Sequence, residues 1–214
     1  MAHSLAPHIH LALFDDRVVV LDVRADRYRL IGGSLASAIV AIANGARPTD
    51  PDAIARLLAM NILIPGPGIE PARIEPARRS ALEEGGTCKD VRSSSVGLAL
   101  AMTLIELRIL GLRRTLSLAR RRQPMLGGGE SRRDEAAALA RGYARARPAV
   151  PVRRVCLRDS LALQRLLSAR DVAATLVIGV KLDPFAAHCW LQDADLVLND
   201  SLHMVGEYRP ILAI

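Results

Sequence analysis

Three residues in the last third of the chain could together form a thiol-nucleophile site: Cys156, His188 and Asp200. Cys156 follows Arg153 and Arg154 and opens an amphipathic pattern, which predicts a helix beginning at the cysteine. Free N–H groups at a helix start, its positive dipole end and cationic neighbours all lower a cysteine pKa and favour the thiolate. The opposing interpretation is a buried structural cysteine, the commoner fate of Cys beside Leu.

The other two residues lie on an expected β-hairpin. If its loop is the three residues 193–195, Gln192 faces Leu196, and His188 then faces Asp200 on the same side of the sheet. A carboxylate there can hold the imidazole tautomer and stabilise its charged form. A loop of two or four residues would shift the register by one and place the pair on opposite faces.

Strand alternation assigns different roles to the neighbours of His188. Cys189 should point to the other face as a small core residue, whereas Trp190 shares the His188 face and should wall a substrate pocket. A metal site built from Cys156, His188 and His203 is a rival, but these residues lack clustered ligand spacing. We therefore expect no metal and no other cofactor.

The first seventy residues contain a pattern of strands followed by helices. Residues 9–31 alternate or are rich in β-branched side chains, with acidic turns between the runs, which predicts three short strands. A helix is expected over 34–44 with Gly45 ending it, then a second helix within 49–60 and a strand-like tail. This order predicts a winged-helix-like module over residues 1–70.

A linker and a second domain are expected after this module. Residues 71–95 are rich in Pro, Gly and charge, which is typical of a linker, and residues 96–214 form the remaining domain. The apolar pattern at 96–122 is helical, but Glu106 and Arg108 interrupt it before the length needed to cross a bilayer. A buried or amphipathic helix is favoured, with peripheral membrane contact as the lesser alternative.

Composition limits the possible partners and compartment. The formal net charge is +7 and the sequence pI is about 10.1, which favours anionic partners, although a solvated helix face is the simpler explanation. Three cysteines cannot all pair within the chain, and an acidic pair interrupts any N-terminal apolar run. These features favour the cytoplasm and free thiols.

The stretch around the candidate site resembles the lasso-peptide leader peptidases, the B proteins of lasso-peptide biosynthesis. The resemblance rests on "CLRDSLAL", "LVIGV", "PFAAHCW" and the closing "LND", and it covers about residues 153–200. The sequence departs from the family at Cys189, where Ala is expected. Residues 1–64 are similar in pattern to the leader-recognition element fused ahead of some of these peptidases. The resemblance implies an α+β fold with a transglutaminase-like (papain-like) cysteine protease core and an antiparallel sheet.

The resemblance also implies a function, namely proteolytic removal of the leader from a ribosomally made precursor peptide, after which a separate macrolactam synthetase closes the ring. Cys156 would be the nucleophile, His188 the general base and acid, and Asp200 the orienting carboxylate. The expected partners are the leader of the precursor and the synthetase, with no nucleic acid and no stable membrane insertion. Two alternatives stay open: a cysteine acyltransferase or transglutaminase with the same triad, and a DNA-binding regulator.

Recognition of the leader would fall to the first module. An extended leader could add a strand beside residues 26–32, with Arg27 and Arg29 facing outward to meet leader carboxylates. The pockets between that strand and the second helix would be shaped by Tyr28, Leu30, Ile54, Leu57 and Leu58. The simpler alternative is that at least two of these residues belong to the core of the module.

Overall fold

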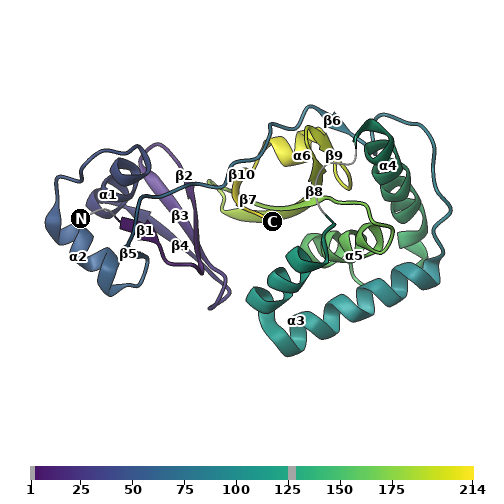
Figure 1. The fold of residues 1–214 in the computed structure, drawn as a ribbon, viewed down its shortest axis with the longest axis horizontal. Helices are drawn as coiled ribbons and strands as arrows, with labels where there is room; N and C mark the ends of the chain where they lie inside the picture. Colours follow the sequence, from purple (N-terminus) through teal and green to yellow (C-terminus); the bar gives the residue numbers. More distant parts are fainter. Residues whose placement is uncertain (1–2, 125–128) are drawn as a thin grey trace. The chain divides into compact units, whose positions relative to one another are not determined.

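The computed structural model describes the backbone of residues 3–124 and 129–214 (Figure 1). The chain divides into two compact units. Unit 1 comprises Met1–Arg73 with Pro210–Leu212, and unit 2 comprises Ile74–Arg209 with Ala213–Ile214. Helices and sheets occur in both, which confirms the expected α+β class.

Unit 1 contains the three strands, the two helices and the strand-like tail that the sequence predicts, and one further short strand. Its elements are β1 (His3–Leu5), β2 (Ile9–Leu13), β3 (Arg17–Asp22), β4 (Arg27–Gly32), α1 (Gly33–Ala43), α2 (Pro51–Ala59) and β5 (Leu63–Pro65). The antiparallel sheet has the order β2-β3-β4, so β4 is an edge strand, and β1 pairs separately with β5. The sequence pattern gave no sign of β1.

Local sequence signals explain the helix ends of unit 1. Asp50 caps α2, since its carboxylate accepts hydrogen bonds from the backbone N–H of Asp52 and of Ala53, and Pro51 begins the helix. The α1 helix stops just before Gly45, which has a φ of 73°. The buried faces of both helices and one face of the sheet form a single apolar core, in which Leu57 is fully buried.

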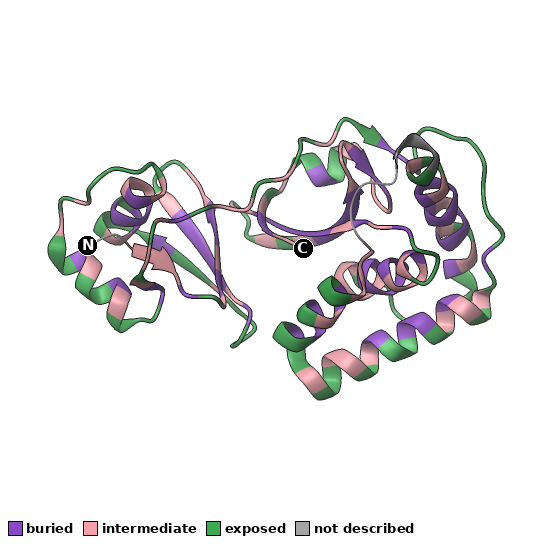
Figure 2. Cartoon of the chain, in the orientation of Figure 1, coloured by how far each residue is buried: buried purple, intermediate pink, exposed green. Residues whose placement is uncertain are grey.

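Unit 2 combines a five-stranded sheet with helices (Figure 1). Its elements are β6 (Arg79–Ser80), α3 (Ser93–Arg122), α4 (Gly129–Ala146), the 3-10 helix η1 (Arg147–Ala149), α5 (Cys156–Ser168), β7 (Thr175–Lys181), β8 (Ala186–Asp193), β9 (Leu196–Val197), α6 (Leu202–Gly206) and β10 (Arg209–Ala213), of which Arg209 and Ala213 fall in unit 2. The strand order is β10-β7-β8-β9-β6, with β7, β8 and β9 antiparallel in turn. Burial is concentrated in β7, β8 and the inner faces of the helices (Figure 2).

The long α3 helix consists of two arms. Gly111 has φ 72° and ψ 174°, which is not helical, and the chain folds back there. Arg122, near the end of the second arm, therefore reaches Glu106 of the first arm, with 2.5 Å between Nη2 and Oε1. Arg165 of α5 also contacts Glu106, at 2.7 Å, so this carboxylate joins both arms to α5. The sequence predicted one continuous helix here.

The segment expected to be a linker is largely part of unit 2. Strand β6 lies within it and pairs in parallel with β9. Ser80 and Ala81 are buried, and the backbone N–H of Ala81 donates to the carbonyl of Val197 at 2.8 Å. Composition did not reveal this strand because its attachment relies on backbone hydrogen bonds rather than on large apolar side chains. The boundary between the units falls between Arg73 and Ile74.

Candidate active site

The structure brings Cys156, His188 and Asp200 together. Cys156 is the first residue of α5, His188 lies on β8, and Asp200 follows β9. The distance from His188 Nε2 to Asp200 Oδ2 is 2.6 Å. The His188 ring is also the hydrogen-bond partner that most lowers the pKa of the Cys156 thiol. The three side chains thus form one hydrogen-bonded chain.

The hairpin register differs from the predicted one, although the predicted contact is present. Asp193 pairs with Leu196, so the loop is the two residues 194–195 and the predicted three-residue loop is wrong. Continued pairing in this register would place His188 and Asp200 on opposite faces of the sheet. The contact must therefore depend on chain geometry beyond the strand.

The contact forms because strand β9 ends at Val197 and the chain then bends. Two hydrogen bonds fix the bent segment at Asp200. The Ser80 hydroxyl donates to the Asp200 carbonyl at 2.7 Å, and the Ser201 N–H donates to Asp200 Oδ1 at 2.9 Å. With Oδ1 held in this way, Oδ2 is directed at His188.

The surroundings of the pair favour the thiolate–imidazolium state. The hydrogen bond to His188 lowers the Cys156 pKa, and this outweighs the opposing effect of burial; the backbone N–H groups of Cys189 and Leu157 lower it further. Burial alone would lower the His188 pKa, but the hydrogen bonds and charges of Asp200 and Cys156 raise it to about 9. Such a thiol is poised as a nucleophile and such an imidazolium as an acid.

The other two cysteines have different environments. Cys189 is 3% exposed, and burial raises the pKa of its thiol, as expected for a core residue. Cys88 is exposed. Of the three thiols, only Cys156 combines partial exposure with a histidine partner.

A buried hydrogen-bond network connects the elements that carry the three residues. The Ser160 hydroxyl, one turn after Cys156, donates to the Cys189 carbonyl at 3.0 Å. Asn199 donates from Nδ2 to Ser160 Oγ at 2.9 Å and accepts from the Leu191 N–H at 2.7 Å. Ser160 is fully buried. The network therefore ties α5, β8 and the segment before Asp200 to one another.

A second network fixes the start of α5. Asp159 accepts hydrogen bonds from the Val155 N–H at 2.9 Å, from the Tyr143 hydroxyl at 3.1 Å and from the Arg147 guanidinium. The Arg147 side chain is only 4% exposed and also donates to the carbonyls of Val150 and Val152. Sequence reasoning missed this network. An acid in the first turn of a helix was a weak signal for Asp159, whereas nothing marked Arg147.

Two aromatic rings pack near the His188 imidazole. The centroid of Tyr208 lies 5.1 Å from that of His188, and the centroid of Trp190 lies at 6.1 Å. Gly179 pairs with His188 across the strands, and a Cβ there would approach Trp190 to 2.7 Å. Trp190 is 3% exposed, so it packs beneath the histidine and does not wall a substrate pocket as predicted.

An open cavity of about 260 Å³ lies beside the Cys156 thiol. Its lining includes Arg154 and Val155, which precede Cys156 in the chain, and Ala140 and Ala144 of α4. The remaining lining residues are Leu82, Tyr143, Arg147, Asp159, Cys189, Asn199 and Asp200. The cavity mixes apolar and polar walls, and Cys156 is one of its lining residues.

The rival metal ligands are not grouped. His203 lies on α6 with 84% of its side chain exposed, and its nearest acidic group is Glu207 at 3.8 Å. Among the residues that the structure describes, no three His, Cys, Asp or Glu side chains are arranged to hold a metal ion.

The residues expected to bind a leader fall into two groups. Leu57 is fully buried and belongs to the core of unit 1, so its assignment to a pocket is wrong; Ile54 and Leu58 also pack against that core, although both stay partly accessible.

On the edge strand β4, Arg29 is exposed and Leu30 is 57% exposed. Tyr28 on the same strand is half-buried. The α1 helix contacts both β4 and α2, so it contributes to the surface between them.

Comparison with known proteins finds a family model and a similar protein. The family model described as the transglutaminase-like superfamily matches residues 99–213, more than half of the chain. The chain is 45% identical over 59 residues to the microcin J25-processing protein McjB of Escherichia coli, and the match spans 28% of each protein. No solved structure matches the chain.

Proposed function

The chain belongs to the transglutaminase-like superfamily, and we propose that it is a cysteine endopeptidase that removes the leader from a ribosomally made precursor peptide. The observation that carries the proposal is the Cys156–His188–Asp200 chain at the start of α5, beside an open cavity. The similarity to a microcin-processing protein and the resemblance of residues 153–200 to lasso-peptide leader peptidases support the choice of substrate.

The geometry suits a two-step hydrolysis. The Cys156 thiolate attacks the scissile carbonyl, and the His188 imidazolium gives its proton to the departing amine as the peptide bond breaks. The leader then remains on Cys156 as a thioester. A water molecule attacks the thioester while His188 takes up its proton, and the leader leaves as a carboxylic acid. Asp200 stabilises the charged imidazole through both steps.

Unit 1 captures the leader in this proposal, in the manner of a winged-helix-like recognition element. The edge strand β4 offers backbone groups for a further strand, and a leader added there would pass the exposed Leu30 and Arg29. Tyr28, Ile54 and Leu58 provide partly accessible apolar surface. The proposed partners are the precursor and a macrolactam synthetase acting on the released core peptide. The cytoplasm is the proposed location, in keeping with three free cysteines.

Product analysis tests this function. Purified protein is incubated with a lasso-peptide precursor, with and without a large excess of a primary amine, and the product masses are measured by mass spectrometry. A hydrolase gives a free leader acid in both reactions. A leader amide as the main product in the presence of amine would instead assign an acyltransferase, and an intact precursor in both reactions would contradict the proposal.

Leader capture has its own test. Titration of the full chain carrying Cys156→Ala with leader peptide should give binding, and Leu30→Glu should weaken it by about tenfold or more because it places a charge in an apolar contact. Met60→Glu is the matched control, since Met60 is another exposed apolar residue of unit 1, at 39%. Equal affinities for the two variants would exclude β4 as the binding edge.

A further inference from the structure

The first arm of α3 carries a stripe of exposed apolar side chains. Leu98, Met102, Ile105 and Ile109 are 63%, 42%, 56% and 72% exposed. Their spacing of four, three and four residues places them on one side of a helix. The opposite side of the same arm, with Val96, Ala99, Leu100 and Thr103, is buried within unit 2. The stripe is therefore a second apolar face that unit 2 does not cover, and such faces commonly mark interaction sites.

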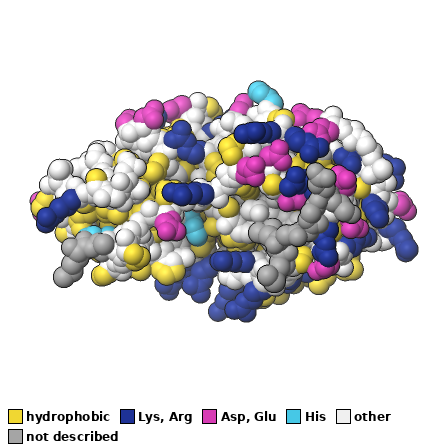
Figure 3. Space-filling model, turned by 45° about the horizontal axis from the view of Figure 1, so that its top comes forward, with side chains coloured by type: hydrophobic (Ala, Val, Ile, Leu, Met, Phe, Trp, Pro, Cys, Tyr) yellow, Lys and Arg dark blue, Asp and Glu magenta, His cyan; other side chains and the backbone are white. Residues whose placement is uncertain are grey.

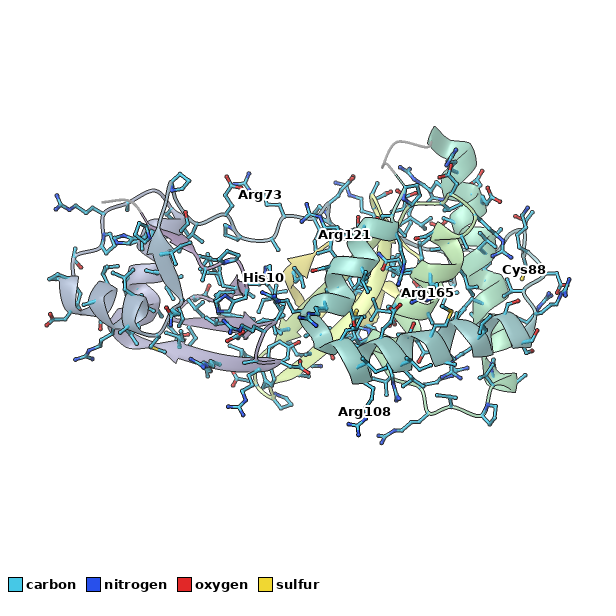
Figure 4. The ribbon with its side chains drawn as sticks, turned by 60° about the horizontal axis from the view of Figure 1, so that its bottom comes forward. His10, Arg73, Cys88, Arg108, Arg121 and Arg165 are labelled. Carbon is cyan, nitrogen blue, oxygen red and sulfur yellow. The ribbon has the colours of Figure 1, made fainter. Side chains whose placement is uncertain are left out.

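Five arginines of α3 lie near or beyond the end of this stripe in the sequence. Arg108 lies one residue before Ile109, and Figure 4 shows its side chain directed away from the ribbon. Arg113 and Arg114 follow directly after the bend at Gly111, and Arg120 and Arg121 continue along the second arm. All five are exposed, and none forms an ion pair within the part of the chain whose side chains the structure describes.

No acidic residue of α3 balances these five arginines. Glu106 is its sole acidic residue, and Arg122 and Arg165 already engage it. Figure 3 shows Lys and Arg side chains gathered at the lower edge of the molecule, in line with the net charge of +7. The apolar stripe and the unpaired arginines thus belong to the same helix, with Arg108 next to Ile109 in the sequence. The occupant of this surface must therefore combine an apolar interior with negative charge.

We propose that the stripe of Leu98, Met102, Ile105 and Ile109 docks onto an anionic membrane surface, with the α3 arginines contacting lipid headgroups. An amphipathic helix with clustered arginines is the arrangement that binds anionic lipid. A second copy of the chain fits less well, because it would bring like-charged arginines together. By length and composition α3 is also apolar enough to cross a membrane. Its bend at Gly111 and its buried second face instead suit a helix lying in the interface.

Vesicle co-sedimentation of the full chain tests the proposal without reference to catalysis. We expect binding to vesicles of phosphatidylglycerol and phosphatidylcholine, weak binding to phosphatidylcholine alone, and loss of binding as salt is added. Ile105→Ser/Ile109→Ser and Arg113→Glu/Arg114→Glu should each weaken binding by about tenfold or more. Both pairs are exposed, so the variants should stay folded. The emission of the single tryptophan, Trp190, and the midpoint of thermal unfolding followed by that emission check this.

Matched controls separate the stripe from general surface effects. Leu30→Ser removes an apolar side chain of similar exposure from unit 1, and Arg24→Glu/Arg27→Glu makes the same charge change there. Both controls should bind within about twofold of the native chain. Three results would overturn the proposal: no sedimentation with anionic vesicles, equal binding to neutral ones, or a dimer in solution that only Ile105→Ser/Ile109→Ser dissociates.

Discussion

Replacing Ser160 by Ala should disturb the site without touching the reacting atoms. Ser160 is fully buried, so no water takes the place of its hydroxyl, and the Cys189 carbonyl and the Asn199 amide each lose a partner. An unsatisfied buried polar group costs about 1–3 kcal/mol, so with partial relaxation we expect a loss of about 2–4 kcal/mol in unfolding free energy. Cys189 follows His188 and Asn199 precedes Asp200. The loosened alignment should therefore lower kcat by about 10- to 100-fold with KM nearly unchanged.

Urea unfolding followed by tryptophan emission, together with steady-state cleavage of the precursor, measures both effects. Ser117→Ala is the matched control, since the Ser117 hydroxyl bonds the Arg113 carbonyl on an exposed helix face, and its unfolding free energy should change by less than about 0.5 kcal/mol. Combining Ser160→Ala with Asn199→Ala should cost less than the sum of the single changes, because both break the same bond. A Ser160→Ala protein with native stability and native kcat would refute the network's role.

Other changes test other parts of the site. Gly179→Ala should lower unfolding free energy by about 1–3 kcal/mol and reduce kcat, because its Cβ would press on the ring beneath His188, whereas Gly206→Ala, with no atom within 4 Å of its Cβ, should not reduce kcat. The pH profile of kcat/KM should fall on the acid side as the thiolate is protonated and on the alkaline side near pH 9 as His188 loses its proton. Because the His188 pKa is raised on folding, its stabilising contribution is complete below about pH 6.5 and is lost as pH rises through about 9, which unfolding at several pH values measures. Asp200→Asn should move the alkaline limb to lower pH, because the carboxylate helps to raise that pKa.

Local patterns were enough to predict much of the fold. The alternation over residues 9–31 predicted β2, β3 and β4, and the capping signals at Asp50 and Gly45 located the helix ends of unit 1. By contrast, β6 pairs with a strand more than a hundred residues away through backbone groups. Because composition gives no information about pairing between distant backbone groups, residues 71–95 were expected to be a linker.

The candidate site shows the same division. Helix-start chemistry singled out Cys156, and strand alternation placed Cys189 in the core. The contact between His188 and Asp200 was predicted through a register that the structure contradicts. It depends on the bend after Val197 and on hydrogen bonds from distant residues, which a pattern of adjacent residues does not encode.

Leader cleavage by single-cysteine variants tests the central claim most directly. Cys88→Ala, Cys156→Ala and Cys189→Ala are each incubated with precursor, and the free leader is quantified by mass spectrometry. We expect no leader from Cys156→Ala, while the other two variants retain most activity because neither thiol faces a histidine. Cleavage by a folded Cys156→Ala protein, or its loss in a folded Cys189→Ala protein, would contradict the assignment of Cys156 as the nucleophile.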